Sequence, residues 1–147
     1  MPRWIGVDYG TRRIGLAISD PAETIASPAA VLDGTGSPSG DARLVCEWAQ
    51  QQDSGGFVVG LPLNMNGSEG PQAVLCKGFA QMLQEATGLP VRLWDERLSS
   101  FQAEAYLDAA GVPASRRQRR RDALAAQVIL QSFLDARGTE PEPPPGR

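Results

Sequence analysis

Residues 4–19 read WIGVDYGTRRIGLAIS, and this stretch decides the fold. Residues 4–8 form an apolar run that ends in Asp8, as expected of a short strand. From Ile14 to Ser19, larger apolar side chains alternate with small ones, which indicates a half-buried second strand. Only Tyr9-Gly10-Thr11-Arg12 separates the two, so the stretch predicts an antiparallel hairpin with Asp8 at the end of its first strand.

The rest of the chain alternates between helical and strand-like patterns. The further elements we expect are a strand at 25–32, which Pro28 places at a sheet edge; a helix from about residue 41; a buried strand at 57–59; a helix from an N-cap at Ser68 to Gly88; a strand at 91–95; a helix from Ser99 to Gly111; and a last helix from about Arg119 to Arg137. This order predicts an α/β fold: an antiparallel meander extended by parallel strands into a mixed sheet, flanked by α-helices.

Composition favours one globular domain. The chain has 147 residues, of which 41% are hydrophobic and 21% charged. We expect the domain to span residues 1–137 and the Pro- and Glu-rich residues 138–147 to be a disordered tail. No apolar run approaches a membrane span of roughly 20 residues, and no signal-peptide pattern precedes the first strand. The expected location is therefore cytoplasmic, with no membrane partner.

The chain contains no histidine, and this excludes much familiar chemistry. Serine–histidine triads and histidine general bases are ruled out, and so are histidine-ligated zinc sites. Cys46 and Cys76 lie in expected helices among apolar neighbours and are interpreted as buried, reduced thiols. Carboxylates remain, and carboxylates without histidine suit oxygen-preferring ions such as Mg²⁺ or Mn²⁺.

Three acidic residues are placed where the fold would bring them together. Asp8 and Glu96 each end a strand, and ligand sites in such sheets form beyond the carboxyl ends of parallel strands. Asp122, expected in the first turn of the last helix, shares a helical face with apolar residues and so points toward the sheet. The alternatives are that Asp8 organises its turn, that Glu96 pairs with a neighbouring arginine, and that Asp122 complements the helix N-terminus.

A divalent cation would offset the repulsion among these carboxylates. One or two Mg²⁺ or Mn²⁺ ions could then activate water against a phosphodiester.

Net charge is −3, which argues against bulk electrostatic coating of nucleic acid, yet arginines crowd residues 116–121. That cluster is either a solvated face or a phosphate-binding surface. The substrate-binding candidates are Thr11, Arg12, Asn66, Arg97, Arg119, Arg120 and Arg121. Asn66, with Asn64, has turn stabilisation as the alternative role.

Five ordered motifs carry a family resemblance. They are Gly6-Val7-Asp8-Tyr9-Gly10-Thr11, Gly15-Leu16-Ala17-Ile18-Ser19-Asp20, Gly60-Leu61-Pro62-Leu63 with Asn66-Gly67-Ser68-Glu69-Gly70, Asp95-Glu96-Arg97-Leu98-Ser99-Ser100, and Asp122 with Ala125-Ala126 and Ile129-Leu130. Across residues 4–136 the chain resembles the YqgF family, also called RuvX.

The resemblance implies an RNase H-like fold with a five-stranded mixed sheet. It also implies a metal-dependent nuclease in which Asp8, Glu96 and Asp122 hold the metal and carry catalysis. The family's proposed role is 5′-end maturation of precursor 16S ribosomal RNA, which makes that RNA, and the ribosome, the expected partners. Cleavage of four-way DNA junctions is the older alternative.

One departure weakens the junction interpretation. Junction resolvases of the RuvC type carry a second acid one turn along the last helix, where this chain has Ala125. Paired incisions also need a symmetric dimer, whereas we expect a monomer or a weak homodimer. A non-catalytic RNA-binding module is a further alternative. An ATPase of the actin-like class would need two such domains, and this chain supplies one.

Overall fold

A computed structural model describes residues 3–98 and 114–139, with side chains for 3–98 and 121–137. Five strands form one sheet: β1 (Arg3–Tyr9), β2 (Arg13–Ser19), β3 (Ala26–Asp33), β4 (Ser54–Leu61) and β5 (Val91–Asp95). The helices are α1 (Pro38–Gln50), α2 (Pro71–Thr87) and α4 (Ala114–Thr139), and η1 (Glu96–Leu98) is a single 3₁₀ turn.

The sheet is mixed, and its strand order is β3-β2-β1-β4-β5. β1, β2 and β3 form the expected antiparallel meander, with Asp8 opposite Gly15 in the hairpin. β4 joins β1 in parallel, and β5 joins β4 in parallel. The predicted five-stranded mixed sheet is therefore confirmed, and β3 with its Pro28 is an edge strand as expected.

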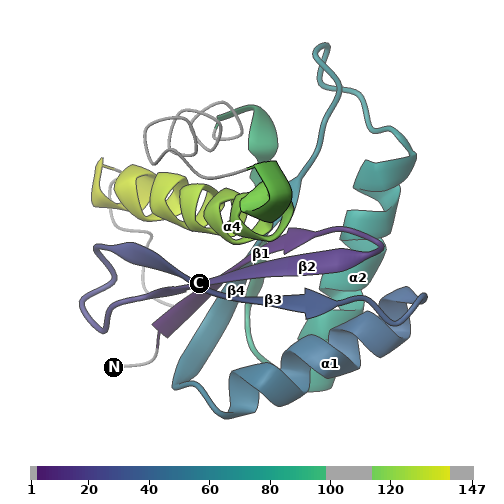
Figure 1. Ribbon diagram of the computed structural model, residues 1–147. Coiled ribbons are helices and arrows are strands. Elements are labelled where there is room, and N and C mark those ends of the chain that lie inside the picture. Colours follow the sequence, from purple (N-terminus) through teal and green to yellow (C-terminus); the bar gives the residue numbers. More distant parts are fainter. Residues whose placement is uncertain (1–2, 99–113, 140–147) are drawn as a thin grey trace.

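The two faces of the sheet are covered by different helices (Figure 1). One face packs on α1 and α2 through a core that includes Ile5, Val7 and Tyr9 of β1. The other face packs on α4, whose Ala126, Ile129 and Leu130 are buried against the sheet. Because strand side chains alternate between faces, Asp8 falls on the α4 side, opposite Val7 and Tyr9.

Glycines let α4 lie close to the strands. A Cβ placed on Gly6 would be 2.7 Å from the Ala126 carbonyl oxygen, and one on Gly15 would be 2.0 Å from the Asp122 carbonyl oxygen. Neither position could carry a side chain without moving the helix or the strand. Gly6 and Gly15 of the β1–β2 hairpin therefore allow α4, which carries Asp122, to pack closely on the sheet.

Some predicted boundaries were wrong. α1 begins at Pro38 rather than near residue 41, because the Ser37 hydroxyl caps it by accepting from the Gly40 N–H at 3.2 Å. The N-cap of α2 is Gly70, not Ser68, whose hydroxyl instead donates to Asn66 within the preceding loop. β4 is longer than the predicted 57–59 strand, since its backbone pairs with β1 from Ser54 onward.

The last helix is also longer than expected. It begins at Ala114, so Asp122 lies in its third turn rather than its first. The effect of a helix N-terminus fades within the first turn, so complementing the helix dipole does not explain Asp122. The predicted helix from Ser99 to Gly111 lies outside the described residues. Of the predicted tail at 138–147, residues 138 and 139 belong to α4 and the rest lies outside the described residues. No helix within the described parts is both long and apolar enough to cross a bilayer.

Candidate active site

Two of the three predicted acids adjoin at the carboxyl edge of the sheet. Asp8 lies near the end of β1, and Glu96 follows β5, with β4 between these two parallel-running strands. Gly60 of β4 makes room for the approach, since a Cβ there would be 2.6 Å from the Glu96 Oε1 atom. The Glu96 carboxyl group reaches back across this gap and shares a hydrogen bond with Asp8.

The environment of this pair disfavours two negative charges. The pKa of Asp8 is raised well above its ordinary value, first by burial of its carboxyl group, then by the charge of Glu96 and their shared hydrogen bond, and last by the charge of Asp122. Burial also raises the pKa of Glu96, although its hydrogen bond with Asp8 opposes that shift. Carboxylates with raised pKa values at one sheet edge are typical of functional sites.

Asp122 reaches the same region from α4. The Arg13 Nε–H donates to Asp122 Oδ2 at 2.8 Å, in an ion pair whose side chains are 30% and 18% exposed. Asp122 is near enough to Asp8 for its charge to raise the Asp8 pKa. Within the residues that the structure describes, no group of three acidic or cysteine side chains stands ready to hold one metal ion.

The predicted substrate-binding residues fall into three groups. Thr11 and Arg12 are exposed in the β1–β2 turn beside Asp8, and Arg121 is half-buried next to Asp122. Arg119 and Arg120 lie in α4, but their side chains are outside the described set. The remaining two, Arg97 and Asn66, have partners within the protein.

Arg97 and Asn66 brace the loop between β4 and α2. Arg97 Nη2 donates to Asp95 Oδ2 at 2.7 Å, and its Nη1 donates to the Met65 carbonyl oxygen at 3.2 Å. Asn66 Oδ1 accepts from the Ser68 N–H at 3.0 Å, which is the turn-stabilising role named as its alternative. Arg97 thus pairs with Asp95 and leaves Glu96 to Asp8. Its ion pair with Asp95 lowers the pKa of that carboxyl group.

The structure adds one residue that sequence reasoning missed. Arg13 is on the α4-facing side of β2, two positions before Gly15, and alternation along the strand carried that signal. Asp20 stabilises the turn after β2, accepting from the Thr24 and Ile25 N–H groups at 2.7 and 3.0 Å. Its pKa is lowered chiefly by the Ile25 bond.

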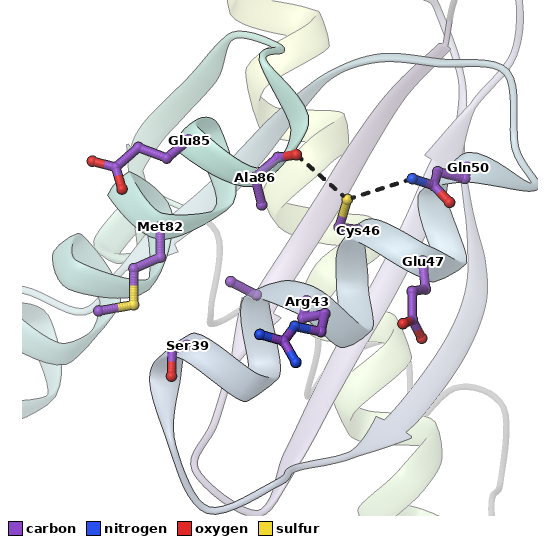
Figure 2. A pocket seen from close by; sticks show the side chains of 9 residues that line it. Ser39, Arg43, Cys46, Glu47, Gln50, Met82, Glu85 and Ala86 are labelled. Carbon is purple, nitrogen blue, oxygen red and sulfur yellow. Dashed lines mark hydrogen bonds between the residues drawn. The ribbon is translucent and has the colours of Figure 1, made fainter.

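A groove in the described part of the molecule lies away from these acids. It measures about 600 Å³ and runs between α1 and α2, on the face of the sheet opposite α4 (Figure 2). Cys46 is half-exposed there, with its Sγ 3.8 Å from the Ala86 carbonyl oxygen, so the prediction that it is buried was wrong. Cys76 is buried as predicted, and burial raises its pKa to about 12. A thiol that stays protonated is a poor nucleophile.

The donor set fits a hard divalent cation. Asp8, Glu96 and Asp122 offer only carboxylate oxygens, which Mg²⁺ and Mn²⁺ prefer. Burial, and after it the charges of Glu96 and Asp122, raise the pKa of Asp8, and a bound cation would stabilise its ionised form. Asp8 and Glu96 are already in contact, whereas Asp122 is turned to Arg13.

The carboxylate pair predicts an unusual dependence of stability on pH. Because folding raises both pKa values, the folded chain keeps these protons to higher pH than the unfolded chain does. Metal-free stability should therefore fall as pH rises from about 4 through the raised pKa of the pair. Thermal unfolding in chelator, measured across pH, should show this fall in the wild type and a flatter profile for Glu96→Gln.

The exposed Glu85→Gln variant is the matched control, since it removes one glutamate charge far from the pair. The difference between each variant and the wild type isolates the contribution of the pair from that of other carboxyl groups. Equal pH profiles for Glu96→Gln and Glu85→Gln would contradict the prediction that the Asp8–Glu96 pair lowers stability as pH rises.

Comparison with known proteins yields matches over nearly the whole chain. The profile of the family described as "RuvX: Holliday junction resolvase" matches residues 2–136. A protein of Pelotomaculum thermopropionicum named "Putative pre-16S rRNA nuclease" is 43% identical over 136 residues, covering 92% of this chain and 88% of its own. One of the same name from Anaeromyxobacter dehalogenans is 47% identical, covering 92% and 98%.

A solved structure supports the fold. Thermus thermophilus RuvC, determined with a Holliday junction substrate, superposes with a TM-score of 0.55 at 18% identity, covering 95% of this chain and 97% of that one. At that identity the similarity concerns architecture alone, and the architecture is the RNase H-like arrangement expected above.

Proposed function

Because the chain belongs to the RuvX family, we propose that it is a divalent-metal-dependent nuclease that acts on precursor 16S ribosomal RNA. The observation that supports this most directly is the contact between Asp8 and Glu96 at the carboxyl edge of the sheet, with Asp122 close by. The names of the relatives support the substrate. The ribosome as a partner and the cytoplasm as the location belong to the same proposal.

In this proposal Asp8, Glu96 and Asp122 hold Mg²⁺ or Mn²⁺. The ion supplies a Lewis acid that favours water ionisation and stabilises negative charge on phosphate oxygens. Arg12, exposed beside Asp8, and Arg121, next to Asp122, would hold flanking phosphates through charge-assisted hydrogen bonds. Arg97 and Asn66 keep the neighbouring loop in place and present its backbone to the RNA. Arg119 and Arg120 would extend the phosphate contacts along α4.

A three-substrate assay tests the proposal. Purified protein is incubated with precursor 16S rRNA ends, with single-stranded oligonucleotides, and with four-way DNA junctions, each in Mg²⁺, in Mn²⁺ and in chelator. We expect cleavage of the RNA substrates in the presence of metal and none in chelator. Cleavage that persists in chelator, or no cleavage of any substrate, would contradict a metal-dependent nuclease.

Junction cleavage is the second candidate, because the family description names it. Against it stands Ala125, one turn along α4 from Asp122, where a resolvase of the RuvC type carries another acid. Symmetric incision of a junction by a dimer in the same assay would favour this function over RNA processing.

A further inference from the structure

Arg13 is the described side chain that anchors the third acid. The ion pair from Arg13 Nε to Asp122 Oδ2 is 2.8 Å long and joins β2 to α4 across 109 residues of sequence. This ion pair holds the carboxylate of Asp122, and the close approach of α4 to Gly15 fixes the position of the Asp122 backbone.

The position of Arg13 is itself well fixed. Its carbonyl oxygen accepts from the Gly10 N–H at 3.0 Å, which closes the β1–β2 turn directly after the strand of Asp8. The hairpin that carries the first acid thus also carries the group that orients the third. A change in the β1–β2 turn would therefore shift both Asp8 and Asp122.

We propose that Arg13 is a positioning residue that orients Asp122 for metal binding, and this inference rests on the proposed metal-dependent function. Carboxylates that bind metals are themselves held by hydrogen bonds, and loss of such a partner typically costs about 10- to 100-fold in metal affinity. Loss of a nearby positive charge would act the other way, because it would strengthen the attraction between the carboxylates and a cation. The two effects have opposite signs, so metal affinity separates them.

The test is Mn²⁺ affinity measured by calorimetry, without substrate, on the full-length protein. Arg13→Gln is expected to weaken Mn²⁺ binding by about tenfold or more. Arg137→Gln is the matched control: Arg137 also forms an ion pair from α4, to Glu23 at 3.0 Å, but at the other end of the helix. It should leave Mn²⁺ affinity at the wild-type value, even if both variants melt at slightly lower temperature.

A double variant shows whether Arg13 acts through Asp122. Asp122→Asn alone should weaken Mn²⁺ binding, and adding Arg13→Gln to it should cause no further loss. Unchanged or tighter Mn²⁺ binding by Arg13→Gln, or a further loss in the double variant, would overturn the inference. Failure of the wild type to bind Mn²⁺ would instead overturn the proposed function. Circular dichroism of each variant confirms that it is folded.

Discussion

Asp8→Asn should abolish cleavage and leave the fold intact. The amide has nearly the same shape as the carboxylate, but it lacks the charge that would bind the cation and is a weaker ligand. Metal ions contribute several kcal/mol of charge stabilisation to phosphoryl chemistry, so we expect a loss of about 10³-fold or more in cleavage rate. The measurement is single-turnover cleavage of precursor rRNA ends at saturating Mg²⁺.

The same variant should be more stable than the wild type when no metal is present. Asp8 carries a carboxyl group whose ionisation is disfavoured by burial and by Glu96, and the amide removes that cost. A higher melting temperature together with lost cleavage would show that Asp8 is needed for cleavage although its carboxyl group destabilises the fold. The exposed Asp53→Asn is the control, and it should change neither property. Wild-type cleavage by Asp8→Asn would remove Asp8 from the mechanism.

The sequence predicts the sheet well, because the sheet depends on alternation within short segments. Asp8 at the end of β1 and Glu96 at the end of β5 follow from local apolar patterns plus the rule that parallel strands share a carboxyl edge. The contact between them needed more than this. It depends on Gly60 in the intervening strand, whose lack of a side chain leaves space for the Glu96 carboxyl group.

The misplaced details have local causes. Serine is a common N-cap residue, but the Ser68 hydroxyl accepts from Asn64 and donates to Asn66 within its own loop. Gly70 is therefore the N-cap of α2. The sequence predicts Asp122 in a first turn because the arginine-rich run before it has no apolar periodicity to indicate a helix. Alternation along β2 places Arg13 on the side of α4, but its partner Asp122 lies 109 residues away, and no local pattern pairs the two.

Gly15→Ala should damage both the fold and the metal site. An added Cβ would be 2.0 Å from the Asp122 carbonyl oxygen and 2.5 Å from its carbonyl carbon, and neither backbone atom can yield as a flexible side chain could. Either α4 moves off the sheet or β2 bends. Overpacking of this kind costs about 1–3 kcal/mol or more, and here it also shifts Asp122 relative to Asp8 and Glu96. Chemical denaturation and Mn²⁺ calorimetry measure the two effects.

Gly78→Ala adds the same methyl group as Gly15→Ala but should raise stability instead of lowering it. Gly78 lies inside α2, and a Cβ there would meet nothing within 4 Å, so alanine should stabilise the protein by up to about 1 kcal/mol through its higher helix propensity. The two substitutions therefore differ in sign, although each adds one methyl group. Metal affinity should fall only for Gly15→Ala, because only there does the added methyl group displace the backbone that carries an acid. Wild-type stability and Mn²⁺ affinity in Gly15→Ala would contradict the claim that close packing of α4 on the β1–β2 hairpin positions Asp122.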